Sequence, residues 1–534
     1  MLDEGGRSHK SAEADSQDLP QLNYGTFSTL PAGAIDSTAL RIDSVEIDNR
    51  NIFNTDSARY NYWIFRMANK LHLRTKRFII ARELLLRRGD IFSRQLADET
   101  ERNLRSLPFL WDADIEFSRT DSSINIMKVT TSDRWTLFGG PSVSRTAGQT
   151  MVEIRGEELN LLGYGQYVSF GYFLRESEDN YLELSFMERR LLGTRYRLSL
   201  DYNDNPEVGL KSISLEKPFY SLDSRFSYNA QFTDIRREDL YYSGGRKVGH
   251  NHTDGNRFES GFMMRFGSYD SKITTGIGYL LSRTKVSGEV GTGISFPEDS
   301  SYYSIGPQLG FSHIKYIKTT RINGFERRED VPIINGSNVG IGWAWGEGGK
   351  KLYNTLSMGF NLAGRFGSNL IFLDAYRSFR YDEHYTLRRQ SAFSLRYFNN
   401  HLLWMTPALF ALYSEDRRGD GSNSLYLGEN NGIRGYPRNY AEGERILRLN
   451  LENRCFTKIR ILSADLGAVQ FLDLAQNRHR GQNFNLGNML WAIGVGLRLG
   501  TERISNAEVL RIDMAYAGQL KSWQISFGLG QYLK

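Results

Sequence analysis

The sequence predicts an all-β transmembrane barrel of about 16 antiparallel strands behind a small N-terminal α+β domain. The first observation behind this prediction is that apolar and polar residues alternate through most of the chain after Trp135, as in strands with one apolar face. The second is that these runs extend over about nine or ten residues, enough for a tilted strand to span a bilayer. The third is composition: glycine (52), tyrosine (29) and phenylalanine (31) are abundant, whereas proline (11) is scarce.

The overall composition excludes some classes of protein and leaves a barrel open. No run of about 18 apolar residues occurs in the 534 residues, which excludes a transmembrane helix. The mean hydropathy of −0.46 does not exclude a barrel, because only every second strand residue faces lipid. The net charge of +6 comes from dispersed Lys and Arg, so we expect no nucleic-acid partner. Cys455 is the single cysteine and cannot form an internal disulfide.

Residues 1–36 are predicted to form a flexible N-terminal segment, because they are rich in Ser, Asp, Glu and Gly. They contain no apolar stretch typical of a secretory signal. An outer-membrane protein needs such a signal, so we expect either that it was removed or that Met1 is an artificial start.

Residues 37–132 are predicted to form the α+β domain. The pattern gives the order β-α-α-β-β, with strands at 40–47, 113–118 and 125–131 and helices at 77–88 and 90–107. Thr75 is the expected N-cap of the first helix and Gly89 its expected stop. Residues 48–74 form an insertion with no assignment.

Residues 133–534 are predicted to form the barrel. Alternation is clearest at 356–362, 446–452, 491–499, 510–516 and 523–530. Long polar loops are expected at 139–151, 242–257 and 415–431, and a short turn at 203–206. A soluble propeller is the alternative, but its repeats of about 40–50 residues are not found.

One segment suggests a loop folded into a polar barrel interior. Arg434 lies between Gly432 and Gly435, after a polar run and before a regularly alternating strand. In that strand Glu452 falls on the polar face, opposite Leu451. Asp473 also falls on a polar face, because it lies an even number of residues after Asp465 and the two side chains therefore point to the same side of a strand. Arg can bind carboxylates through two parallel hydrogen bonds.

Several segments resemble the BamA/TamA outer-membrane assembly superfamily, with one periplasmic POTRA domain ahead of a 16-stranded barrel. Ile433-Arg434-Gly435-Tyr436 resembles the signature of the sixth loop, and Phe471-Leu472-Asp473-Leu474-Ala475 resembles the family's Phe-x-Asp-x-Gly. Weaker resemblances lie at 89–107 (POTRA second helix), 131–137 (POTRA-to-barrel junction), 160–165 and 217–220 (opening barrel strands).

The resemblance implies a sixth-loop lock formed by Arg434, Gly435, Tyr436, Glu452 and Asp473. Three departures bear on it. Ala475 replaces a glycine, the sequence ends 530–534 without a terminal aromatic residue, and only one POTRA-like domain is present.

The last strand is a candidate edge for a client strand. Gly528 and Gly530 would weaken packing there, or they would relieve crowding in the lumen, and the two interpretations are equally supported by the sequence.

The resemblance implies an insertase or translocase that assists assembly of β-barrel proteins in the bacterial outer membrane. Its expected partners are client outer-membrane proteins, the lipid bilayer and a periplasmic partner at the POTRA-like domain. The alternative is a two-partner-secretion transporter that exports one protein; a passive porin would leave Arg434 unexplained. We expect no enzyme, cofactor or metal, and His250 to Asp254 are interpreted as a polar loop.

Overall fold

The computed structural model describes residues 27–29, 40–121, 124–146, 149–175, 179–206, 208–243, 246–290, 300–400, 402, 404–418, 425–501, 503–505 and 509–532. The chain divides into two compact units. The first holds the described residues up to Gly140 together with 155–169 and 503–505, and the second holds the others. No helix among the described residues is long and apolar enough to cross a membrane.

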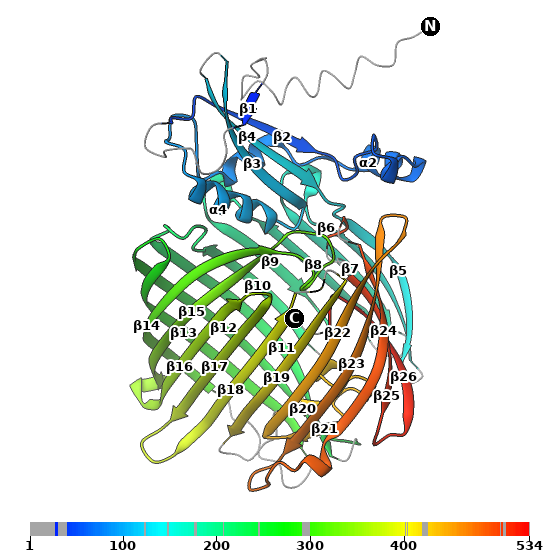
Figure 1. Ribbon diagram of the computed structural model, residues 1–534. Helices are drawn as coiled ribbons and strands as arrows, with labels where there is room; N and C mark the ends of the chain where they lie inside the picture. Colours follow the sequence, from blue (N-terminus) through cyan, green and yellow to red (C-terminus); the bar gives the residue numbers. More distant parts are fainter. Residues whose placement is uncertain are drawn as a thin grey trace. The chain divides into compact units, whose positions relative to one another are not determined.

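The N-terminal domain contains a four-stranded sheet of order β1-β3-β4-β2 (Figure 1). Strands β2 and β4 are parallel, and the other pairs are antiparallel. The elements are β1 Phe27–Thr29, β2 Ser44–Arg50, η1 Ala58–Tyr60, α2 Trp63–Leu71, α3 Arg77–Glu83, α4 Arg94–Arg105, β3 Leu110–Thr120 and β4 Asn125–Asp133. The predicted β-α-α-β-β order is present as β2, α3, α4, β3 and β4. The unassigned insertion contributes η1 and α2, and β1 lies inside the segment predicted to be flexible.

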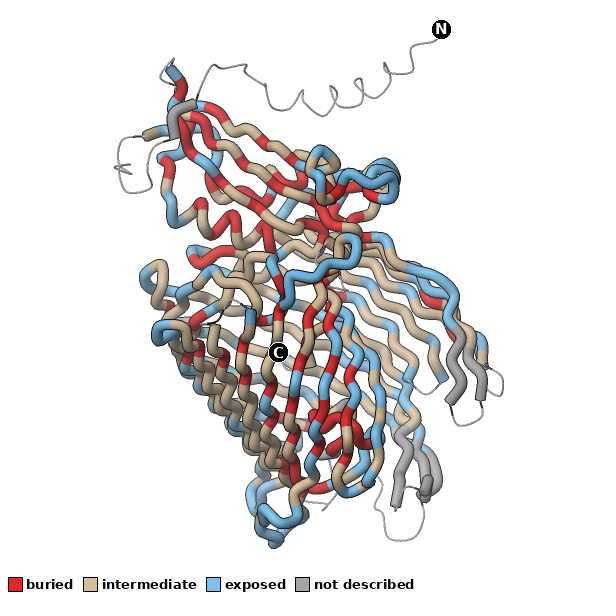
Figure 2. The backbone as a smooth tube through the Cα atoms, turned by 45° about the vertical axis from the view of Figure 1, so that its right-hand side comes forward, coloured by how far each residue is buried: buried red, intermediate tan, exposed pale blue. Residues whose placement is uncertain are grey.

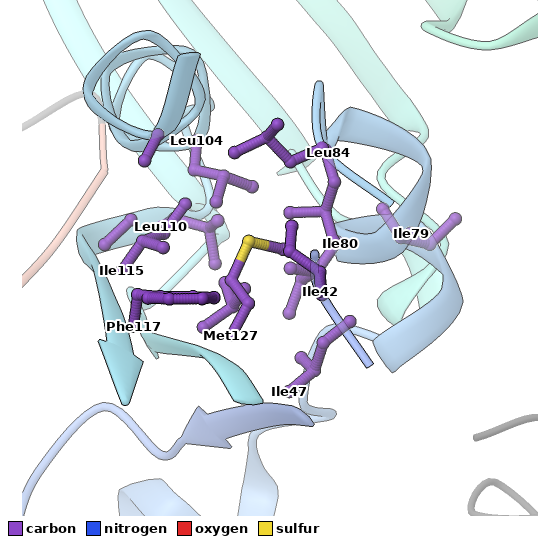
Figure 3. Packing of buried hydrophobic residues seen from close by; sticks show 14 of the residues in the cluster. Ile42, Ile47, Ile79, Ile80, Leu84, Leu104, Leu110, Ile115, Phe117 and Met127 are labelled. Carbon is purple, nitrogen blue, oxygen red and sulfur yellow. The ribbon is translucent and has the colours of Figure 1, made fainter. Parts of the chain in front are cut away.

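The domain core lies between this sheet and the helices α3 and α4 (Figure 3). Ile80, Leu104, Leu110 and Met127 are fully buried in it. These residues come from both helices and from β3 and β4, and Ile47 of β2 is buried in the same cluster, so the core joins all five predicted elements.

Both predicted helices are shorter than the sequence pattern indicated. Helix α4 begins after Ser93, whose Oγ accepts from the Leu96 N–H at 3.4 Å. Before it, the Asp90 carboxylate accepts the Arg87 N–H at 2.7 Å and Gly89 has φ +94°, which forms a turn. Thr75 is not the N-cap of α3; its hydroxyl accepts from Asn160 Nδ2 at 2.8 Å, and Lys76 occupies the cap position.

Twenty strands close into an antiparallel barrel among the described residues, in the order β5 to β19, β22 to β26 and back to β5. The strands are β5 Leu137–Thr146, β6 Gln149–Glu158, β7 Tyr167–Arg175, β8 Tyr181–Glu188, β9 Arg197–Asn203, β10 Val208–Lys217, β11 Phe226–Ser243, β12 Arg246–Gly267, β13 Ser271–Val290, β14 Ser300–Thr319, β15 Glu329–Gly346, β16 Lys351–Phe366, β17 Asn369–Tyr381, β18 Thr386–Asn399, β19 Met405–Arg418, β22 Arg445–Ile461, β23 Ala464–Arg478, β24 Leu490–Gly500, β25 Val509–Ala517 and β26 Ser522–Leu529. Between them lie η2 Leu161–Gly163, η3 Leu191–Gly193, η4 Glu347–Gly349, η5 Glu429–Asn431, η6 Leu486–Asn488 and the pair β20 Leu425–Leu427 and β21 Ala441–Gly443.

The predicted fold class is confirmed, but the expected number of about 16 strands is too low. Two segments predicted as long loops are largely strand. The described residues of 139–151 belong to β5 and β6, and those of 242–257 belong to β11 and β12, so His252 and Asp254 lie in a strand. The described connections are therefore shorter than expected, and the same length of chain holds more strands.

The alternation predicted for the barrel strands is confirmed in the wall. In β24, Ile493, Val495 and Leu497 are exposed, whereas Ala492, Gly494 and Arg498 face inward. Strands β25 and β26 show the same alternation. Buried positions concentrate on β22 to β25 (Figure 2). This part of the wall therefore packs against material inside the lumen.

Leu104→Ala should destabilise the N-terminal domain by about 2–5 kcal/mol, because it leaves a cavity in a fully buried core. Limited proteolysis of the full chain in detergent, over a urea series, would show earlier loss of the domain and an unchanged heat-resistant barrel band. Leu73→Ala is the matched control, because Leu73 is exposed. Equal protease resistance of Leu104→Ala and wild type would contradict the packing described.

Candidate functional site in the barrel lumen

The connection between β19 and β22 carries a segment folded into the lumen. We call residues 425–444 the inserted loop. Its base is the short hairpin of β20 and β21, which Figure 1 places near the end of the barrel opposite the start of β5. Its middle reaches the inner wall, where Ile433, Arg434 and Tyr436 are completely buried. By strand order it is the eighth connection at this end of the barrel, not the sixth, because the ring has twenty strands.

Two glycines allow the inserted loop to approach the wall. Gly432 has φ +107°, and a Cβ there would lie 1.7 Å from Arg448 Nη1. Gly435 has φ +80°, and a Cβ there would lie 3.1 Å from the Cβ of Ala515 on β25. The positive φ and the close approach together require glycine at both positions.

Arg434 binds two carboxylates of the wall. Its Nε and Nη2 donate to Asp473 Oδ2 and Oδ1, each at 2.8 Å, and its backbone N–H donates to Asp473 Oδ2 at 3.1 Å. Its Nη1 donates to Glu452 Oε1 at 2.8 Å. All three side chains are completely buried. Separating Arg434 from these carboxylates is costly, because a buried charge without a counter-ion is unfavourable.

Asn450 completes the hydrogen bonding of this clamp. Its Nδ2 donates to Asp473 Oδ1 at 2.7 Å and to the Gly432 carbonyl at 2.9 Å. The structure therefore brings Arg434, Glu452 and Asp473 together. The alternation of the sequence had placed the two acids on polar strand faces, which is where they lie. The contribution of Asn450 was not predicted, although it shares a face with Glu452.

Aromatic rings cover the guanidinium of Arg434. Its Cζ lies 3.5 Å from the centroid of the Phe471 ring and 4.3 Å from that of Tyr532. The Tyr532 hydroxyl donates to the carbonyl of Glu429, and the Glu429 carboxylate accepts the Gly435 N–H at 2.8 Å. Tyr532 follows β26, so residues after the last strand also help to hold the inserted loop.

Tyr436 anchors the far side of the inserted loop on β24. Its hydroxyl donates to the Trp491 carbonyl at 3.0 Å and also hydrogen-bonds Gln519. Its ring belongs to a buried cluster with Ala475, Ala492 and Ala517 of the wall. Ala475, which stands where the resembling family carries glycine, thus adds its methyl group to this contact.

The ionic contacts continue from Glu452 toward the other end of the lumen. Glu452 Oε2 accepts from Arg454 Nε at 3.0 Å, and Arg454 Nη1 hydrogen-bonds the carbonyl of Ile322. A second cluster lies nearby, with Arg498 Nη1 at 2.7 Å and Arg511 Nη1 at 2.8 Å from the carboxylate of Asp513. Arg498 lies on the inward face of β24 and Asp513 on that of β25, and the register of these strands brings them together.

The turn between β14 and β15 also enters the lumen, and the sequence did not predict this. We call residues 320–328 the inner turn. Its shape is set by Glu329, whose carboxylate accepts the backbone N–H groups of Ile322, Asn323 and Gly324 at 2.9–3.2 Å. Phe325 is buried across the lumen, against Phe456 and Val509 of the opposite wall.

Small residues on that wall make room for Phe325. A Cβ at Gly500 would lie 2.4 Å from its ring, and its centroid is 5.1 Å from that of Phe456. The inner turn and the inserted loop therefore enter from opposite ends and meet through Arg454 and Glu452.

The two glycines proposed at the strand edge have different roles. A Cβ at Gly528 would lie 2.5 Å from Arg511 Nε, so Gly528 leaves space for a lumen arginine. Gly530 lies beyond β26, with φ +75°, and its N–H donates to the Val509 carbonyl at 2.7 Å. The placement of Gly530 in the last strand was wrong. It lets the chain turn from the strand toward Tyr532.

The described residues contain no group of three or more His, Cys, Asp or Glu side chains suited to hold a metal ion. The clamp consists of permanently charged arginine and its counter-ions. What such an arrangement can do is fix one segment of chain against another.

No family model matches the sequence, and no curated protein sequence is similar to it. Solved structures do match. BamA from Haemophilus ducreyi lacking POTRA domains 1–3 is 10% identical, with 99% of this chain and 93% of that chain covered and a TM-score of 0.38. CdiB from Acinetobacter baumannii is 12% identical, with 98% and 97% covered and a TM-score of 0.41. CdiB from Escherichia coli is 12% identical, with 91% and 74% covered and a TM-score of 0.40. These values are too low to assign a function, which has to be argued from the barrel and its lumen.

Arg434→Ala should release the inserted loop while the barrel still forms. The change leaves the buried carboxylate of Asp473 without its arginine and Glu452 with Arg454 alone, at a cost of about 3–5 kcal/mol. External protease should then cleave within 425–444, and the heat-dependent gel shift of the barrel should persist. Arg438→Ala is the matched control, because Arg438 is exposed in the same loop. Protection of the loop in Arg434→Ala equal to that of wild type would rule out the clamp as what holds it.

Phe325→Ser should loosen the inner turn and raise single-channel conductance, because a polar side chain loses the contacts with Phe456 and Val509. Planar-bilayer recording would measure the change. The control is Phe366→Ser, at an exposed phenylalanine where β16 ends, on the same side of the barrel. If both variants conduct like wild type, the inner turn does not restrict the lumen.

Proposed function

We propose that this protein is an outer-membrane insertase or translocase that assists insertion and assembly of β-barrel proteins. In this proposal the N-terminal domain lies in the periplasm. The observation that carries the proposal is the uneven height of the barrel wall. Strands β26 and β5, which close the ring, have 8 and 10 residues, and β8 and β9 on the same side of the ring have 8 and 7, whereas β12 and β13 have 22 and 20.

The closing strands are short compared with a bilayer. Eight residues extend over about 26 Å, and a tilt of about 45° reduces this to roughly 18 Å across the membrane. The hydrocarbon layer is about 30 Å thick, so lipid beside this seam has to thin. A strand of eight residues can form only a few interstrand hydrogen bonds, which favours opening beside β26.

Side chains on β26 are also less covered than those of neighbouring strands. Phe527 is 74% exposed and Trp523 is 60% exposed, whereas Met514 on the adjacent β25 is 41% exposed. A strand whose apolar side chains are poorly covered by the adjacent strands is suited to pair with an incoming apolar strand. We infer that a client strand adds at the β26–β5 seam.

The N-terminal domain offers a second place for strand addition. Strand β2 forms one edge of its sheet in the described residues. Edge strands expose backbone N–H and C=O groups that can pair with an extended segment. We propose that a client or a periplasmic partner docks there before it reaches the seam.

Export through the lumen, as in two-partner secretion, is the alternative. It would require the inserted loop and the inner turn to leave the lumen together, although Arg434 and Phe325 are buried there. Insertion of a client at the β26–β5 seam does not require either segment to leave the lumen. Lateral insertion is therefore the function that the described geometry supports better.

A cross-linked seam should abolish insertion. In a Cys455→Ser background, Gln524→Cys or Ser526→Cys would be combined with single cysteines along 137–142, and a pair that oxidises completely would be selected. Reconstituted vesicles should fold a denatured eight-stranded barrel faster than empty vesicles, and oxidation should remove this acceleration reversibly. Each single-cysteine variant under the same oxidant serves as control.

The two functions give different outcomes in that experiment. Acceleration that persists in the oxidised protein, or no acceleration by the wild type, would contradict lateral insertion. Transfer of an unfolded secreted protein into the vesicle interior, unaffected by the cross-link, would establish the export alternative instead.

A further inference from the structure

The insertion between β2 and α3 displays an apolar surface that nothing in the described chain covers. Helix α2 has Trp63, Ile64, Met67 and Leu71 on one face, within an arc of about 100°. All four side chains are exposed, Trp63 by 67% and Leu71 by 65%. Tyr62 and Leu73, at the two ends of the helix, extend the exposed apolar surface.

The opposite face of α2 is firmly held, so the exposed face is not the result of a loosely placed helix. Phe65 is buried against Phe53, with ring centroids 4.6 Å apart, and against Tyr60. Asn69 forms two hydrogen bonds with the backbone of Phe53, at 2.7 and 3.1 Å. The helix therefore has an anchored face and a free face, both apolar.

The segment around α2 is strongly basic. Residues 57–82 contain seven Lys or Arg residues and neither Asp nor Glu. Arg66 and Lys70 are exposed and lie beside Trp63 on the helix surface. A short helix with Trp, Ile, Met and Leu on one side and basic residues beside them is typical of helices that lie in the surface of an anionic bilayer.

The position of α2 in the first unit brings it close to the entry of the chain into the barrel. His72, just after α2, bonds the Asp133 carboxylate through Nε2 at 2.8 Å, and the Thr75 N–H donates to the same carboxylate at 2.7 Å. Asp133 ends β4, and β5 starts four residues later at Leu137, a reach of at most about 14 Å. This short connection lets α2 reach the surface of the bilayer in which the barrel is embedded.

We propose that α2 is an interfacial anchor that binds the surface of the bilayer around its own barrel, with Trp63, Met67 and Leu71 entering the acyl boundary and Arg66 and Lys70 binding anionic headgroups. This holds whether the protein inserts or exports its client; it requires only that the barrel is embedded. The anchor would fix the N-terminal domain at the membrane surface.

Quenching by brominated lipids tests this proposal on the full chain. Met67→Cys in a Cys455→Ser background would carry an environment-sensitive fluorophore, and the protein would be placed in nanodiscs of phosphatidylethanolamine and phosphatidylglycerol. Brominated acyl chains should quench this label about two-fold or more relative to unbrominated lipid. A label at Glu116→Cys, an exposed position on β3, is the control and should not be quenched.

Two further arms test the chemistry of the contact. Adding Trp63→Ser and Leu71→Ser should abolish quenching at position 67, while Phe65 keeps the helix docked and the protease pattern unchanged. Replacing phosphatidylglycerol by phosphatidylcholine, or raising the salt concentration, should weaken the contact. The proposal would be overturned by an absence of quenching at position 67, or by equal quenching at position 116. It would also be overturned if an added periplasmic protein, but not lipid, protected position 67.

Discussion

The buried pairing of Arg434 with Asp473 and Glu452 is the constraint on which the lumen structure depends. It joins a loop from one end of the barrel to two neighbouring strands of the wall. Water cannot replace these partners, because all three side chains are excluded from solvent. Arginine suits this role since it stays charged and can bond both carboxylates in one plane.

The clamp also explains why one side of the barrel differs from the rest. Strands β22 to β25 carry small and buried residues toward the lumen, such as Ala475, Gly500 and Ala515, because the inserted loop and the inner turn pack there. The seam between β26 and β5 follows directly after this side in the ring. Tyr532, just beyond β26, covers Arg434, so the closing strand and the clamp are physically connected.

Much of the barrel could be predicted because lipid imposes a two-residue period. The inward positions of Glu452 and Asp473 followed from parity alone, and the structure places both inside. The strand number did not follow. Residues 242–257 are polar and rich in Gly, so they carry no apolar period, yet the described ones, such as those at 246–257, pair through their backbone within β11 and β12. Backbone pairing needs no apolar residue where a strand extends beyond the lipid.

The features that the sequence could not predict are those that depend on distant contacts. Phe325 resembles any aromatic residue in a turn until Gly500 and Phe456 are known to face it. Helix α2 was left unassigned, since only part of its apolar face is buried and the usual core pattern is absent. Register, which parity does not determine, decides that Arg498 on β24 meets Asp513 on β25.

Hydrogen–deuterium exchange of the full chain in nanodiscs tests the central claim most directly. If Arg434 holds the inserted loop inside the lumen, backbone amides of residues 432–436 should exchange as slowly as those of β22 and β23. Exchange of these amides as fast as that of the exposed turn at 382–385 would show that the loop is free and would contradict the account.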